Sequence, residues 1–174
     1  ETLAFVNVDY LEGFEVADLR TGKVIHQVKV EPQAYAPNTP NPVHGIGLTA
    51  DETELWQTGG AKDNYKVYVF DATVMPPKQI TSVPVRELPK WISFSIDNRY
   101  VYPGTGDVID RVQRKVVAQI AKSKRQVEVD FVNGVPIRSA DMYGLGYVGA
   151  TPRPDVTPTP GTAPSLRPEE YLPW

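Results

Sequence analysis

Hydrophobic and polar residues alternate over short stretches of the chain, and the stretches end at turn-forming pairs. Ile92, Phe94 and Ile96 occupy every second position, and the alternation stops at Asp97-Asn98. A period of two is typical of a β-strand with one buried face, and Asp and Asn favour turns. The pattern therefore predicts a strand, an acidic turn and a second strand, which together form a β-hairpin.

This hairpin pattern occurs twice. Residues 42–60 match residues 88–106 without a gap, at an offset of 46 residues. Each copy begins with the hairpin and ends in a glycine-containing loop, Gly59-Gly60 in the first copy and Gly104-Thr105-Gly106 in the second. Self-similarity over such a distance indicates a repeat architecture rather than a sandwich of unrelated strands.

A second pair of strands also recurs. The first strand of each pair ends in an aspartate, and a run rich in β-branched residues follows after a turn. The three pairs are Phe14–Asp18 with Lys23–Val28, Val67–Asp71 with Lys78–Val83, and Asp107–Asp110 with Lys115–Ile120. Because Asp18, Asp71 and Asp110 occur once in every repeat, we expect them to form turns rather than a catalytic pair of carboxylates.

The repeating unit therefore has four strands, which is typical of a β-propeller blade. We predict an all-β fold, a partial β-propeller of about three four-stranded antiparallel blades. It occupies residues 1–149, with blades near 1–30, 43–85 and 89–121 and a hairpin near 127–140 that turns at Asn133-Gly134. The proline- and threonine-rich residues 150–174 form an extended C-terminal tail, because such sequences bury little surface.

Five short motifs resemble the repeat of the YVTN-type bacterial β-propeller family. They are His44-Gly45-Ile46, Thr49-Ala50-Asp51, Leu55-Trp56, Val16-Ala17-Asp18 and Thr21–Ile25; the third repeat departs, with Arg114-Lys115 in place of Gly-Lys. The resemblance covers residues 3 to about 140. It implies a propeller fold and a periplasmic or secreted location, and it says little about activity, because these are turn and core residues.

With the strands of a blade labelled a to d from the propeller axis outward, the first strand, Leu3–Val8, occupies position b. Thirteen strands are expected in total, too few for a conventional closed ring. Three explanations are open: a truncated or processed half of a larger propeller, a partial propeller that self-associates, or a subunit completed by a different protein. The first two are favoured, because the start at a b strand and at Glu1-Thr2-Leu3 resembles a cut.

Composition and charge exclude several classes of function. The chain of 174 residues has no cysteine, which excludes disulfides, thiolate metal sites and a cysteine nucleophile. Its formal net charge of −3 gives no general attraction to nucleic acid. No apolar run approaches the ~20 residues of a membrane helix. No spacing of His, Asp and Glu indicates a metal site, and no motif indicates a cofactor.

Candidate ligand-binding residues lie just before the predicted innermost strands, where loops converge on the channel mouth. They are His44, Lys90 at the matching position of the next repeat, and Trp91 beside it. Binding residues commonly line such mouths, although a single polar loop residue more often has a structural role. The acidic run Asp51–Glu54 favours a solvated turn over a calcium site, because its copy at Asp97–Tyr100 lacks the charge.

Candidate partner-binding residues lie in an insertion, a basic stretch and the tail. They are Tyr35 in the insertion Glu31–Val43, Arg111, Arg114 and Lys115 in the stretch without acidic residues, and Tyr171 and Trp174 in the tail. The basic stretch has two interpretations, an outer edge protected by positive charge or a docking surface for an acidic partner.

The most specific functional hypothesis is a non-catalytic binding module that packs against other chains or against the rest of a propeller. Long loops on a rigid scaffold are where contact residues tend to lie. The alternative is a part of a propeller enzyme, lactonase-like or quinoprotein- or dehydrogenase-like, whose site is completed by further blades.

Overall fold

A computed structural model describes residues 2–36, 39–40, 42–121 and 126–140 of the chain. The predicted tail at 150–174, with Tyr171 and Trp174, lies outside these residues. All regular elements of the described residues are β-strands, thirteen in number. Among the same residues no helix is present that is long and apolar enough to cross a membrane.

The strands form four antiparallel sheets in which neighbours follow one another along the chain. Blade 1 contains β1 (Leu3–Val6), β2 (Gly13–Asp18) and β3 (Lys23–Lys29). Blade 2 contains β4 (Ile46–Leu48), β5 (Glu54–Gly59), β6 (Lys66–Asp71) and β7 (Lys78–Pro84). Blade 3 contains β8 (Ser93–Phe94), β9 (Tyr100–Tyr102), β10 (Asp107–Asp110) and β11 (Lys115–Gln119). The hairpin contains β12 (Glu128–Val132) and β13 (Val135–Ala140).

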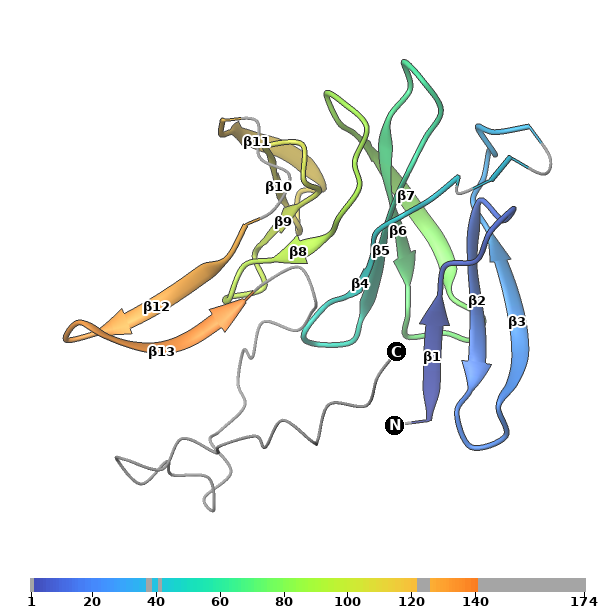
Figure 1. Cartoon of the computed structure of the whole chain (residues 1–174), viewed down its shortest axis with the longest axis horizontal. Coiled ribbons are helices and arrows are strands. Elements are labelled where there is room, and N and C mark those ends of the chain that lie inside the picture. The colour runs from blue at the N-terminus through green and yellow to red at the C-terminus, as the bar shows by residue number, and fades with distance from the viewer. Residues whose placement is uncertain (1, 37–38, 41, 122–125, 141–174) are drawn as a thin grey trace, which may run out of the picture.

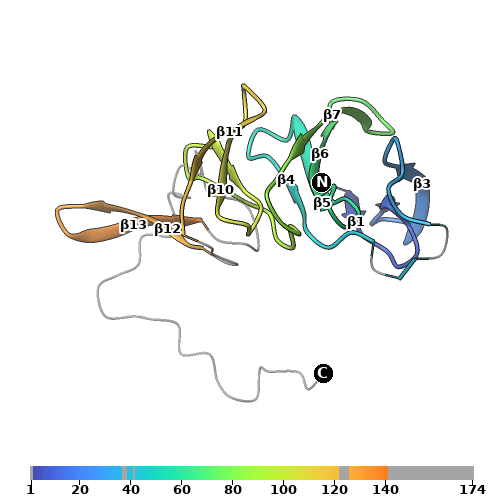
Figure 2. The same cartoon turned by 90° about the horizontal axis from the view of Figure 1, so that it is seen from above.

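The blades stand side by side in an arc, with blade 1 at one end and the hairpin at the other (Figures 1 and 2). Consecutive four-stranded meanders packed face to face are the architecture of a propeller. The prediction of an all-β partial propeller is therefore confirmed, and the number of described strands equals the predicted thirteen.

Blade 2 is the centre of the core because both of its faces are buried. Along β6, Tyr68 and Phe70 face blade 1, whereas Val67 and Val69 face blade 3. All four side chains are almost completely buried, which explains why this strand reads as a continuous apolar run instead of an alternating one. Phe70 meets Phe14 of blade 1 edge to face, with 5.0 Å between ring centroids.

The turns of the two matching hairpins are built by the same hydrogen bonds. Thr49 N donates to Glu54 O and Ser95 N donates to Tyr100 O, both at 2.9 Å. In each turn the hydroxyl of Thr49 or Ser95 also donates to an aspartate two residues later, Asp51 or Asp97. The internal repeat read from the sequence is therefore a repeat of hydrogen bonding as well as of strand order.

The recurring aspartates at the ends of β2, β6 and β10 have the expected turn role. Asp18 accepts the backbone N–H of Arg20, Asp71 that of Thr73 and Asp110 that of Gln113. The hairpin turns at Asn133-Gly134, where both residues have positive φ angles of 50° and 77°, as expected for an Asn-Gly turn of type I′.

Three turn carboxylates, those of Asp51, Asp71 and Asp97, make the stability of the fold depend on pH. Hydrogen bonds from Ser95 and Thr73 lower the pKa values of Asp97 and Asp71, respectively. Partial burial alone would raise the pKa of Asp51, but hydrogen bonds from Thr49, Thr53 and Arg111 outweigh it and lower that pKa. A carboxyl with a lowered folded-state pKa stabilises the fold above its unfolded value of about 3.9, and this contribution is lost as the pH falls below it.

We therefore expect the urea midpoint of unfolding to decrease as the pH is lowered from about 5 to about 2. Tryptophan fluorescence during urea titrations at each pH measures it. The triple variant Asp51→Asn, Asp71→Asn, Asp97→Asn should be less stable at about pH 6 and should show a flatter dependence on pH. An equally steep dependence in this variant would contradict the assignment to these three groups.

Candidate functional site

Several connections lie along one rim of the arc, where β1, β3, β5 and β7 end, and we call this rim the loop end (Figure 1). It comprises the β1–β2 connection (7–12), the β3–β4 connection (30–36 and 42–45), the β5–β6 connection (60–65) and the β7–β8 connection (85–92). Two contacts tie these segments together. Asn7 Nδ2 donates to His44 O at 2.8 Å, and Tyr35 Oη donates to Gly60 O at 2.8 Å. The candidate residues His44, Lys90, Trp91 and Tyr35 all belong to the loop end.

The structure brings His44 and Trp91 into contact. Their rings meet edge to face, with 4.4 Å between centroids and an interplanar angle of 73°. His44 and Lys90 are exposed and Trp91 is half-buried. The backbones also approach closely, because a Cβ on Gly45 would lie only 2.8 Å from Lys90 O. His44, which precedes β4 of blade 2, therefore forms one patch with Lys90 and Trp91, which precede β8 of blade 3.

Beside this patch, a polar connection that the sequence did not indicate joins blades 1 and 2. Gln57, fully buried in β5, donates through Nε2 to Asn7 Oδ1 and to Gly13 O, each at 2.6 Å. Its Oε1 atom has no partner within the described part of the chain. No group of three or more His, Asp or Glu side chains that could hold a metal ion occurs among the described residues.

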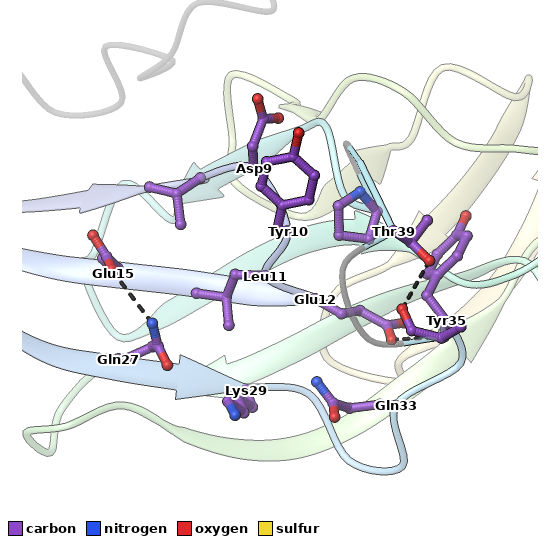
Figure 3. A pocket seen from close by; sticks show the side chains of 13 residues that line it. Asp9, Tyr10, Leu11, Glu12, Glu15, Gln27, Lys29, Gln33, Tyr35 and Thr39 are labelled. Carbon is purple, nitrogen blue, oxygen red and sulfur yellow. Dashed lines mark hydrogen bonds between the residues drawn. The ribbon is translucent and has the colours of Figure 1, made fainter.

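A pocket of about 430 Å³ opens at the loop end of blade 1 (Figure 3). Its inner wall includes Glu12, a residue that is only 3% exposed. Glu12 Oε2 accepts the backbone N–H groups of Ala34 at 2.7 Å and Tyr35 at 3.0 Å, and Oε1 accepts the Tyr68 hydroxyl at 3.2 Å. Three donors compensate the burial of this carboxylate, which therefore anchors the insertion to blades 1 and 2.

Tyr35, the candidate from the insertion, also has an anchoring position. It is half-buried and lines the pocket. Burial, followed by the negative charge of Glu12 and the neighbouring Tyr65, raises the pKa of its hydroxyl, so the group stays protonated as the donor to Gly60 O. Burial and Glu12 raise the pKa of Tyr68 in the same way.

Arg111 and Arg114 bind acidic residues of the same chain. Arg111 Nη1 lies 2.9 Å from Asp51 Oδ2, and Arg114 Nη2 lies 2.7 Å from Glu54 Oε1. Glu54 Oε2 also accepts Trp56 Nε1 at 3.1 Å. These pairs join the outer turn of blade 3 to blade 2. Lys115, the third candidate of the basic stretch, is exposed at the start of β11.

Comparisons with known proteins agree with the fold. No protein-family model matches the chain, and no curated protein matches it in sequence. Among solved structures, it is similar to hydrazine synthase of Kuenenia stuttgartiensis, with a TM-score of 0.55 and 22% identity. The match covers 74% of this chain and 36% of that one, so the chain spans about a third of the length of its relative. At this identity the similarity concerns the fold alone.

Replacement of Glu12 tests its anchoring role. Glu12→Ala leaves two backbone N–H groups and the Tyr68 hydroxyl without their acceptor, and we expect a loss of about 3 kcal/mol of unfolding free energy. Glu12→Gln keeps one carbonyl acceptor and should cost less. Chemical denaturation measures both, and hydrogen exchange at Ala34 and Tyr35 should accelerate most in Glu12→Ala. If these two amides exchanged at the same rate in the unsubstituted protein and in both variants, the anchoring role of Glu12 would be contradicted.

Proposed function

We propose that the chain is a non-catalytic interaction module, a part of a propeller that packs against the rest of a propeller or against another chain. One observation carries this proposal: among the described residues, β1 lacks the inner neighbour that the second strand of each of the other two blades has. β5 pairs with β4 and β9 pairs with β8, whereas β1 pairs with β2 alone among the described residues. Such a bare edge is a template for another strand.

The opposite end of the arc supports the same proposal. The hairpin is a two-stranded sheet, which is marginally stable without a covering layer. Val127 and Phe131 are 66% and 62% exposed, and Val132 is exposed beside them. In blades 2 and 3 the matching hairpin is followed by two further strands. The similarity of the repeat motifs to YVTN-type propellers supports the proposal too, and with it a periplasmic or secreted location.

The internal repeat predicts the sequence of a strand that would pair with the edge of β1. In blade 2 the inner strand places Ile46 opposite Gln57 and Leu48 opposite Leu55. Gly47 lies between them, where a Cβ would meet side chains of blade 3, Ile92 Cγ2 at 2.8 Å and Phe94 Cε2 at 2.9 Å. By analogy, β1 accepts an antiparallel strand with an apolar, small, apolar sequence, whose small residue faces β4.

A peptide copied from the chain tests this expectation. The peptide of residues 43–50 should bind the folded protein and slow hydrogen exchange of backbone amides within Leu3–Val6, because they gain ladder hydrogen bonds. The same peptide with Gly47→Val should bind at least about tenfold more weakly, since the added side chain has no space. NMR titration measures both. Equal binding of the two peptides, or protection elsewhere than on β1, would contradict the proposal.

A catalytic role is a second candidate, favoured by the contact between His44 and Trp91 beside exposed Lys90. An exposed imidazole held by an aromatic ring can serve as a general acid or base in a site that further blades complete. In that case His44→Ala lowers the turnover of the complete assembly by about 100-fold or more without changing its mass. His26→Ala, on the outer strand β3, is the control. Unchanged turnover in both variants excludes a catalytic His44.

A further inference from the structure

The floor of the pocket of blade 1 is formed by Glu15, Gln27 and Lys29. Glu15 of β2 and Gln27 of β3 are cross-strand partners, and Gln27 Nε2 donates weakly to Glu15 Oε1 at 3.4 Å. Lys29 lies two positions further along β3 and therefore on the same face. Gln27 and Lys29 are exposed, whereas the alternate residue Val28 is buried in the core. The carboxylate of Glu15, the amide of Gln27 and the ammonium group of Lys29 therefore lie near one another on the pocket floor.

Tyr10, on the β1–β2 connection, also lines the pocket. Figure 3 shows its ring beside Asp9 on one side of the pocket, with Lys29 and Gln33 on the opposite side and Leu11 between them. The side chain is 61% exposed, so packing against the protein does not explain its position.

The backbone of Tyr10 is strained. Its φ angle is +66°, and it is the only aromatic residue among the described non-glycine residues with positive φ. The left-handed region is unfavourable for a bulky side chain and is favoured by glycine. The fold thus holds an exposed aromatic ring at the margin of the pocket, in a backbone conformation that glycine would adopt without strain. Strain of this kind concentrates at ligand-binding positions.

We propose that this pocket binds a saccharide of one or two sugar rings. Each sugar hydroxyl both donates and accepts hydrogen bonds, which fits a floor that offers carboxylate acceptors, amides and an ammonium donor side by side. The apolar face of a sugar ring packs on an exposed aromatic ring, the position that Tyr10 holds. The volume of about 430 Å³ lies within the range of small-molecule sites.

The charges of the wall argue against the simplest competing ligand. Asp9, Glu12 and Glu15 contribute three carboxylates and Lys29 one ammonium, so an inorganic anion would be repelled. A neutral sugar is not repelled by either charge, and its hydroxyl groups can hydrogen-bond to the carboxylates and to the ammonium group. This proposal does not depend on the proposed assembly, because the pocket residues belong to blade 1 and make no use of the bare edge of β1 or of the hairpin.

Titration with neutral saccharides tests the site directly. The probes are methyl glycosides of glucose, galactose, mannose and N-acetylglucosamine, together with cellobiose and chitobiose, added to the isotope-labelled protein. At least one should shift the resonances of Tyr10, Gln27 and Lys29 in a saturable manner below about 50 mM, since weak sites have millimolar dissociation constants. Glycerol at the same concentrations is the control. The absence of a saturable shift at these residues with all six probes would overturn the proposal.

Substitution of Tyr10 separates a binding role from a structural one. Tyr10→Gly should raise the midpoint of thermal unfolding, because glycine relieves the strain, and should weaken binding of the best probe by tenfold or more, because the ring is lost. The matched control is Asp63→Gly, another exposed residue with positive φ, in the β5–β6 connection. It should leave binding unchanged. If Tyr10→Gly lowered stability, or if it left binding intact, the assignment of the ring to a saccharide would be wrong.

Discussion

The structure depends on the burial of both faces of blade 2. The alternate side chains of β6 point to blade 1 and to blade 3, so a single strand belongs to both core clusters. Because the hydrophobic effect is proportional to the apolar area removed from water, blade 2 is stable only between its neighbours. Neither core cluster can form within one isolated sheet, and the blades are therefore a cooperative unit rather than independent hairpins.

Polar contacts then determine how the blades are oriented about this core. Blade 1 is joined to blade 2 by Gln57 and by Glu12, both buried and both bonded to atoms distant in sequence. Blade 3 is joined to blade 2 at the opposite side by the pairs of Arg111 and Arg114. Buried hydrogen bonds are directional, whereas apolar packing is not, so these residues favour one arrangement of the sheets among several that would bury similar area.

The surfaces that we propose for contact with other chains lie where this packing stops. Within the part of the chain that the structure describes, blades 2 and 3 have complete four-stranded sheets, and incomplete pairing lies at the two ends of the arc, on β1 and on the hairpin. The loop end carries the connection between β3 and β4 and the pocket of blade 1, and irregular connections on a scaffold of strands are where binding residues tend to lie. A rigid central part with open ends is well suited to assembly, and the ligand pocket on its loop end is compatible with that role.

The sequence by itself determined the strands, their order and the turns, because alternation and turn-forming residues such as Asp97-Asn98 and Asn133-Gly134 act over a few positions. The 46-residue repeat also predicted that His44 and Lys90 stand at equivalent positions before two strands, with Trp91 next to Lys90. The tertiary structure alone decided that these two rings touch, that Glu12 is a buried anchor, and that Arg111 and Arg114 bind Asp51 and Glu54 sixty residues away. The saccharide pocket was likewise invisible, since Tyr10, Glu15 and Gln27 are ordinary surface types in sequence. The physical reason is that a strand pattern reports which face is apolar, whereas the partner of a polar side chain depends on which blade lies beside it.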